Sequence, residues 1–222
     1  MMIKKLSYLL VVIFIVLLFL IPLFIKVRIE CKSQFGDCPA EVNSKLQTLN
    51  SKSLFSADRA IRKDLKESFL VSDFSIQFKL PNIMLVNVIA KKPYFALKDP
   101  SSGKFQLIDQ KGIVLALADS SNLPTVVSTE SVKKAGELIG TRDLFALNLI
   151  SGVYEMYQVG YGVITNDALT VDIPHGVRVI FPLEGDSEVL LGSLRLVYTK
   201  VTASYLGIYS QIDMRYRNPV LR

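Results

Sequence analysis

The 222-residue sequence contains no tryptophan, a single histidine and two cysteines. The histidine, His175, lies between Pro174 and Gly176, a pattern that predicts an exposed turn. Two cysteines and one distant histidine do not supply the four ligands of a structural zinc site. The sequence also has no G-x-S-x-G elbow, P-loop or G-x-G-x-x-G fingerprint. We therefore expect no metal, no cofactor and no small-molecule substrate, although two scattered carboxylates that meet in space could still form an unrecognised active site.

A strong excess of charge of one sign is also missing. The formal net charge is +6, and Lys4, Lys5 and Lys26 account for half of it. No run of Lys and Arg alternates with aromatic residues that could stack on bases. This balance is typical of an ordinary solvated surface and argues against nucleic-acid binding.

One long hydrophobic run is present, and it precedes the rest of the chain. Leu6 to Ile25 contains no charged residue, and its length at ~1.5 Å per residue spans about 30 Å, one hydrocarbon core. We predict a transmembrane helix over residues 6–25 behind a short cytoplasmic tail, residues 1–5. A cleaved signal peptide is disfavoured because the run is long and lacks an A-x-A-like site. A buried core helix is a third interpretation.

The basic residues on either side of the run do not fix its orientation. Lys4 and Lys5 precede it, while Lys26, Arg28 and Lys32 follow it, so the positive-inside count is almost balanced. The long C-terminal part is therefore either all cytoplasmic or all extracytoplasmic.

The two cysteines lie close together in the sequence. Cys31 and Cys38 enclose KSQFGD, in which Gly36-Asp37 can turn the chain. A disulfide between them would close a short loop, and using both cysteines in this way suits an oxidising compartment. Two free thiols are the alternative.

Residues 27–98 predict a compact unit of strands and helices. Helical spacing marks two helices, through Val42 and Leu46 and then through Ala57, Ile61 and Leu65. The period then changes to two, with strands in FSIQFKL and IMLVNVIAK. The expected order is strand, helix, helix, strand, strand.

Residues 99–222 predict a second domain made mainly of antiparallel strands with two helices. FQLIDQKGIVLAL reads as two strands around a turn, and NLPTVV as an extended link. A helical region is expected over 132–159 and another over 187–207. GYGVITNDALTVDI, GVRVIFPLE and IYSQIDMRYR alternate as strands. The fold class expected for the whole chain is α+β.

Three stretches, taken in order behind the N-terminal anchor, resemble the FtsQ/DivIB family of bacterial cell-division proteins. They are the strand pair with its exit at Lys91-Lys92-Pro93, the stretch Ile108-Asp109-Gln110-Lys111-Gly112, and QIDMRYRN near residue 216. The likeness covers nearly the whole chain, but each motif is short. The C-x6-C segment and the lack of tryptophan depart from the family pattern.

The resemblance implies a fold, a place and a function. The fold is a POTRA-like β-α-α-β-β domain over 27–98, followed by a β-domain over 99–222. The place is the bacterial cytoplasmic membrane at the division septum, as a single-pass protein with its N-terminus inside and its bulk outside. The function is that of a divisome scaffold, not an enzyme, which contacts FtsB/FtsL-like bitopic coiled-coil proteins and regulates septal wall synthesis.

The resemblance also suggests where a partner binds. We expect the strand Tyr209 to Tyr216 to lie at a sheet edge, where a partner strand can add by backbone hydrogen bonds. The residues expected to contact the partner are Tyr216, Arg215, Asn218, Glu184 and Tyr209. Alternatively, Tyr216 packs beneath the last strand, and Asp213 and Arg215 form a structural cross-strand pair.

Two other functions remain open at the level of sequence. A POTRA-bearing transport or assembly factor is one, although such chains usually have a barrel or several POTRA repeats, and no internal repeat is seen here. A membrane-anchored extracytoplasmic enzyme is the other. A cleft with paired carboxylates or with His175 at its base would favour the enzyme, whereas an exposed strand edge would favour the scaffold.

Overall fold

The computed structural model describes residues 25–128, 132–203 and 209–222. The predicted tail, residues 1–5, and all but the last residue of the predicted transmembrane helix, 6–25, lie outside the described residues. Within the described part, none of the helices has the length and apolar composition needed to cross a membrane. The chain is α+β and divides into two compact units, with the division between Lys91 and Lys92.

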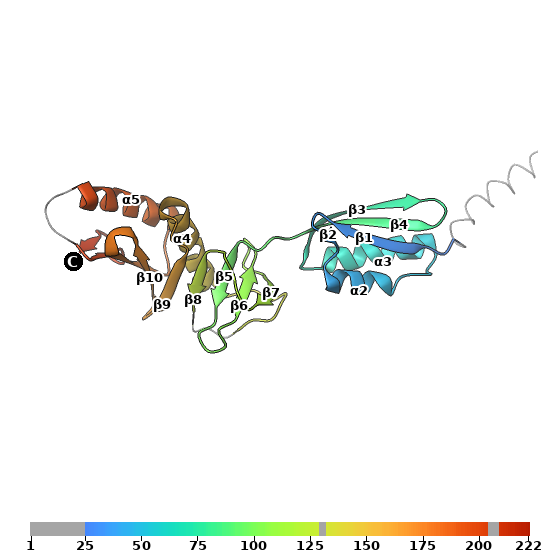
Figure 1. The fold of residues 1–222 in the computed structure, drawn as a ribbon, viewed down its shortest axis with the longest axis horizontal. Helices are drawn as coiled ribbons and strands as arrows, with labels where there is room; N and C mark the ends of the chain where they lie inside the picture. Colours follow the sequence, from blue (N-terminus) through green and yellow to red (C-terminus); the bar gives the residue numbers. More distant parts are fainter. Residues whose placement is uncertain (1–24, 129–131, 204–208) are drawn as a thin grey trace, which may run out of the picture. The chain divides into compact units, whose positions relative to one another are not determined.

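The first unit is a two-layer arrangement of one sheet and two helices (Figure 1). Its elements are β1 (Arg28–Ser33), β2 (Gly36–Asp37), α2 (Ala40–Gln47), α3 (Leu54–Glu67), β3 (Val71–Lys79) and β4 (Ile83–Ala90). The sheet order is β2-β1-β4-β3, with β1 parallel to β4 and β3 antiparallel to it. The expected order of strand, two helices and two strands is present, with the short β2 added after β1.

Both helices of this unit bury one apolar face against the sheet. In α3, Ala57, Ile61 and Leu65 recur every four residues and are almost fully buried. They meet alternate residues of the strands, such as Ile29 in β1 and Val86 in β4. Burial of these side chains supplies the main stabilising term of the unit.

The second unit has a nine-stranded mixed sheet and two long helices. Its elements are β5 (Phe95–Lys98), β6 (Phe105–Ile108), β7 (Val114–Ala118), β8 (Thr125–Val127), α4 (Thr141–Tyr157), β9 (Tyr161–Thr165), β10 (Ala168–Ile173), the 3-10 turn η1 (Pro174–Gly176), β11 (Val177–Pro182), α5 (Ser187–Ala203), β12 (Gln211–Asp213) and β13 (Val220–Leu221). The described strands follow the order β13-β12-β11-β10-β9-β8-β5-β6-β7. The pairs β5–β8, β8–β9 and β11–β12 are parallel, and the other pairs are antiparallel.

The core of the second unit lies between this sheet and the helices α4 and α5. Leu147, Ile150 and Val153 of α4 and Leu194 of α5 are completely buried. The two helices pack against each other at Gly152, where an added Cβ would come within van der Waals overlap of the Leu191 side chain. A small residue at this position therefore sets how closely α5 approaches α4.

Three sequence-based expectations for this unit are wrong in detail. The domain boundary expected after residue 98 falls before β5, because β5 pairs with β6 and β8 of the second sheet. NLPTVV is not a link, since its last three residues form β8 between β5 and β9, with Val126 fully buried. The predicted helical region starts only at Thr141, because the stretch before it pairs with the turn at Gly112 instead, through bonds such as Ile139 N–H to the Gly112 carbonyl (3.0 Å).

The last strand also differs from its prediction. We expected Tyr209 to Tyr216 to form one edge strand, but β12 covers only Gln211–Asp213 and has neighbours on both sides. The chain turns back after Tyr216, and Val220–Leu221 pairs antiparallel with Ile212 and Asp213. The edge of the described sheet at this side is therefore β13.

Candidate partner-binding site

The turn that follows β12 is held by an ion pair between Asp213 and Arg215. Nε of Arg215 donates to Oδ1 of Asp213 at 2.9 Å, and Nη2 donates to Oδ2 at 2.6 Å. The backbone N–H of Arg215 also donates to Oδ1 at 3.2 Å. Asp213 is fully buried, whereas the Arg215 side chain is 41% exposed. The pair therefore closes the turn and leaves the Arg215 side chain partly in solvent.

The electrostatics of this pair follow from the same contacts. Hydrogen bonds from Arg215 lower the pKa of the Asp213 carboxyl below its ordinary value of 3.8, while burial acts in the opposite direction. The same bonds raise the pKa of Arg215. Asp213 is thus ionised at neutral pH and accepts all three hydrogen bonds as a carboxylate. The pair expected as one of the alternatives is present, but it lies within one turn and not across two strands.

Tyr216 and Asn218 are displayed by this turn. Tyr216 is 53% exposed, so it does not pack beneath the last strand. Asn218 is also exposed. Because β11 and β12 are parallel, the segments that follow them leave the sheet at the same end. Glu184, which follows β11 and is exposed, therefore lies at the same end of the sheet as Arg215, Tyr216 and Asn218.

Tyr209 does not join these residues. It precedes β12 and is half-buried. A strand carries its two flanks to opposite ends of the sheet. The structure therefore brings four of the five sequence-predicted site residues to one end and places Tyr209 at the other.

Sequence reasoning missed the edge strand β13. Gln211 and Arg222 exchange two backbone hydrogen bonds, at 2.9 and 3.0 Å. In an antiparallel pair such residues alternate with residues whose N–H and C=O point away. The backbone groups of Leu221 therefore face outward from the edge of the sheet as the structure describes it. The dipeptide Asn218-Pro219 is a turn signal that could have revealed this hairpin.

The other predicted pair, Cys31 and Cys38, forms a disulfide in the first unit. Cys31 lies in β1, and Cys38 directly follows β2 and is buried in the core of the unit. The bond joins the two ends of the β1–β2 hairpin, in which Lys32 pairs with Asp37. It ties this hairpin to the start of α2.

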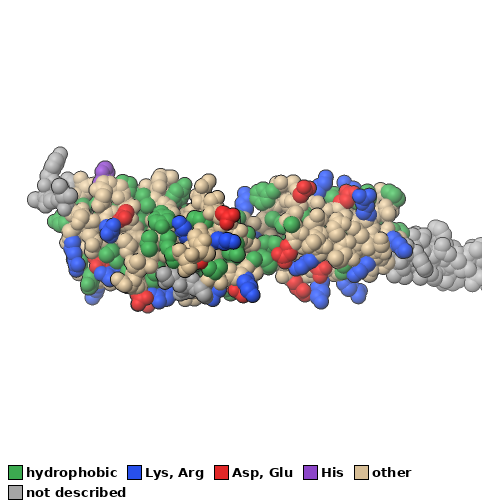
Figure 2. Space-filling view, turned by 60° about the horizontal axis from the view of Figure 1, so that its bottom comes forward, with side chains coloured by type: hydrophobic (Ala, Val, Ile, Leu, Met, Phe, Trp, Pro, Cys, Tyr) green, Lys and Arg blue, Asp and Glu red, His purple; other side chains and the backbone are tan. Residues whose placement is uncertain are grey.

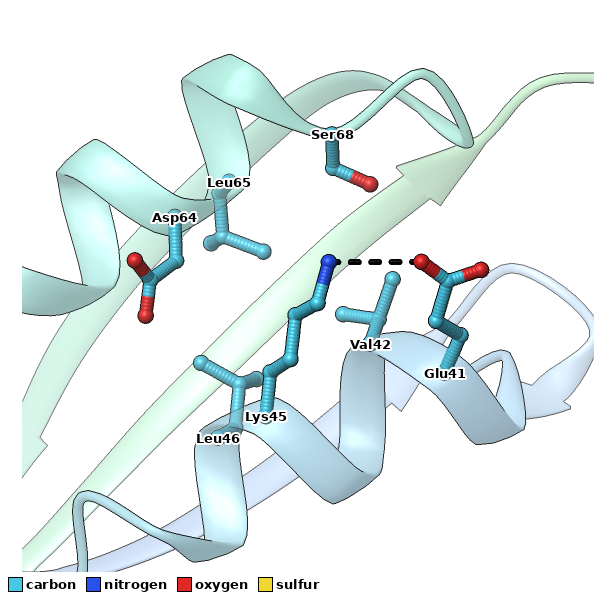
Figure 3. A pocket seen from close by; sticks show the side chains of 7 residues that line it. All are labelled: Glu41, Val42, Lys45, Leu46, Asp64, Leu65 and Ser68. Carbon is cyan, nitrogen blue, oxygen red and sulfur yellow. Dashed lines mark hydrogen bonds and ion pairs between the residues drawn. The ribbon is translucent and has the colours of Figure 1, made fainter. Parts of the chain in front are cut away.

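Three hollows in the described part of the chain bear on the enzyme alternative. A hollow between α2 and α3 has a free volume of about 10 Å³ (Figure 3), which is room for about one water molecule. It is lined by Glu41, Val42, Lys45, Leu46, Asp64, Leu65 and Ser68, with an ion pair between Lys45 and Glu41 at 3.2 Å. It is therefore a packing defect between helices and too small for a substrate.

Two open grooves are larger, with volumes of about 370 and 490 Å³. Each is lined by one carboxylate, Asp73 in the first unit and Glu155 in the second, and neither is lined by His175. The second groove also contains Tyr157 and Tyr198, and burial raises the pKa of both phenols, which keeps them protonated near neutral pH. Neither groove holds the paired carboxylates or the histidine that would have favoured an enzyme.

The surface and the comparisons with known proteins add little chemistry. Over the face drawn in Figure 2, basic and acidic side chains are interspersed on both units. Among the described residues, no group of three or more His, Cys, Asp and Glu side chains is placed to hold a metal ion. No protein-family model and no curated protein matches this chain.

Proposed function

We propose that this protein is a single-pass scaffold of the cell-division machinery, of the FtsQ/DivIB type. In this proposal residues 6–25 cross the cytoplasmic membrane, with the N-terminus inside and both units outside. The first unit is the POTRA-like domain and the second is the β-domain. The protein acts at the septum through protein contacts, without a cofactor, a small-molecule substrate or nucleic acid, and it is not an enzyme.

The observation that carries the proposal is the hairpin of β12 and β13. Its turn is rigidly supported by the buried Asp213, yet it exposes Tyr216 next to an open strand edge at Leu221. An exposed aromatic beside free backbone groups suits a partner that adds a short strand and packs one side chain against the ring. The partner expected from the resemblance is the extracytoplasmic part of an FtsB-like protein.

The test is a binding measurement with residues 25–222 prepared under oxidising conditions. The strands and helices of both units, as far as the structure describes them, lie within residues 25–222, so this fragment includes both units. Its affinity for the extracytoplasmic part of the host's FtsB-like protein is measured by titration calorimetry. Tyr216→Ala is expected to weaken binding by about tenfold or more, as an exposed aromatic anchor does.

Tyr161→Ala is the matched control, because Tyr161 lies in the same unit and is 52% exposed. A second pair of variants tests the strand edge. Leu221→Pro removes the outward N–H, whereas Leu221→Ala shortens the side chain and keeps it. Weaker binding of the proline variant than of the alanine variant supports strand addition. Equal affinities for Tyr216→Ala and Tyr161→Ala would refute the proposed site, and no binding by the folded wild type would refute the scaffold.

A further inference from the structure

One end of the first unit combines exposed apolar and basic side chains. Three segments meet there: the start of β1, the start of α3 and the turn between β3 and β4 (Figure 1). The turn carries Leu80, which is 84% exposed, followed by the exposed Pro81. Phe55 in the first turn of α3 is 57% exposed, and Phe78 at the end of β3 is 38% exposed. Large apolar side chains so open to solvent, and so close together in the fold, call for a partner.

Backbone hydrogen bonds join the three segments into one built surface. The N–H of Val27 donates to Lys52 at 3.1 Å, and the N–H of Leu54 donates to Ile25 at 3.1 Å. The N–H of Arg28 donates to the carbonyl of Asn82 at 2.9 Å, which ties the β3–β4 turn to the start of β1. The backbone segments that carry the apolar side chains are therefore held in fixed positions relative to one another.

The charged residues of these three segments have one sign, and the nearest acid along α3, Asp58, is paired with Arg62 at 2.8 Å. The cations of this end are Lys26, Arg28, Lys52 and Lys79, and all four side chains are exposed. The three segments, KVR, NSKSLF and FKLPNI, contain no aspartate or glutamate. The first turn of α3 also contains no acidic residue. This distribution differs from the mixed charges on the rest of the unit and matches an anionic surface.

This surface directly follows the long apolar run in the sequence, which indicates what kind of partner it contacts. It begins at Ile25, where the uncharged apolar run of residues 6–25 ends. We propose that this end of the first unit is a membrane-contact surface, in which Leu80, Phe55 and Phe78 enter the headgroup region and the four cations bind anionic lipid headgroups. Basic and apolar side chains in one surface are the usual means of interfacial binding. The inference rests on the anchored topology of the proposed function.

A tryptophan reporter tests this contact, because the natural chain contains no tryptophan. Leu80→Trp is prepared in the full chain and reconstituted into vesicles of phosphatidylglycerol and phosphatidylcholine that contain brominated lipid. The matched control is Phe35→Trp, because Phe35 is 64% exposed in the β1–β2 turn at the opposite end of the unit. We expect the emission of Trp at position 80 to shift to the blue. We also expect the brominated lipid to quench it at least about twofold more than it quenches Trp at position 35.

Charge variants then separate the contribution of the cations from that of the apolar side chains. In the Leu80→Trp chain, the triple change Lys26→Gln, Lys52→Gln and Lys79→Gln should reduce quenching in anionic vesicles. The control changes Lys32→Gln, Lys63→Gln and Lys66→Gln remove the same charge from exposed positions towards the other end and should leave quenching unchanged. Equal loss in both triple variants would overturn the proposed role of these cations.

Flotation of the same vesicles distinguishes this inference from the anchor on which it rests. If the chain floats with the vesicles but position 80 is quenched no more than position 35, the membrane-contact surface is refuted and the anchor stands. If the chain does not float, both the anchor and the contact surface are refuted. The partner-binding measurement on residues 25–222 contains no lipid and is independent of either result.

Discussion

Asp213 illustrates how one buried carboxylate shapes an exposed surface. It has no solvent exposure, yet it accepts three hydrogen bonds from Arg215 and so fixes the turn that exposes Tyr216. Asp109 lies in the stretch Ile108 to Gly112, which also contributes to the family resemblance. It is likewise buried, and it accepts hydrogen bonds from the N–H groups of Lys111 and Ile113, both at 2.9 Å. Both aspartates therefore fix the backbone conformation of the turns that follow them.

The first prediction concerns Asp213→Asn. The change preserves size but removes the charge that accepts from Arg215, and we expect the second unit to lose about 1–2 kcal/mol of unfolding free energy at pH 7. Because the folded-state pKa of Asp213 is lowered, its stabilising contribution is present above the unfolded pKa and lost as pH falls through the folded pKa. The difference from wild type should therefore shrink below about pH 4, as urea titrations at several pH values would reveal.

Asp172→Asn is the control for this prediction. Asp172 also pairs with an arginine of the same unit, Arg178, at 2.8 Å, but both side chains are more than half exposed. An exposed pair contributes little to stability. If Asp172→Asn destabilised the unit as much as Asp213→Asn, burial would not be the reason for the effect at Asp213.

At the scale of the elements, the contact between α4 and α5 depends on a glycine. A Cβ at Gly152 would overlap Cδ1 of Leu191, whereas a Cβ at Gly192 in α5 would meet nothing within 4 Å. A glycine in a helix interior lowers the stability of the helix by about 1 kcal/mol relative to alanine. The same substitution at the two positions therefore isolates the packing term from the propensity term.

We expect Gly192→Ala to stabilise the second unit by about 0.5–1 kcal/mol. Gly152→Ala gains the same propensity but must displace the Leu191 side chain, so it should be less stable than Gly192→Ala by about 1 kcal/mol or more. Urea denaturation of the two variants measures the difference. Equal stability would mean that Leu191 moves aside without cost.

The elements also show which parts of the fold can be predicted from sequence patterns. Periodic segments such as α3 and β3 were predicted because one face of each packs against the core and imposes a period on its residues. β8 was missed because three residues are too few to show a period, and only its position between β5 and β9 makes it a strand. The edge of the described sheet, β13, has two residues, too few to show a period, and its pairing depends on the turn that Asp213 and Arg215 hold. At the candidate site, exposure of Tyr216 and burial of Asp213 likewise depend on tertiary packing.

At the scale of the whole molecule, the two units have separate cores, and only the first contains a disulfide. A bridge that closes so short a loop contributes about 2.5 kcal/mol by restricting the unfolded chain. Reduction with dithiothreitol should therefore lower the stability of the first unit by about this amount and leave the second unchanged.

Calorimetry of residues 25–222 with and without the reductant would measure this effect. The Cys31→Ser, Cys38→Ser double variant should reproduce the reduced state and should not respond to dithiothreitol. A shift of both units by the same amount on reduction would show that they unfold as one cooperative block.

The parallel pairing of β1 with β4 has a mechanical consequence. The start of β1 is joined to the run expected in the membrane, and the end of β4 leads out of the unit at Lys91. Because the two strands are parallel in register from Arg28↔Ile83 to Ser33↔Val88, these attachment points lie at opposite ends of the ladder. Tension between the membrane and the second unit would therefore pull the strands along their length. The hydrogen bonds of the ladder would then be loaded together in shear, and they would not break one after another. The first unit would therefore resist tension applied between its two attachment points through the whole β1–β4 ladder.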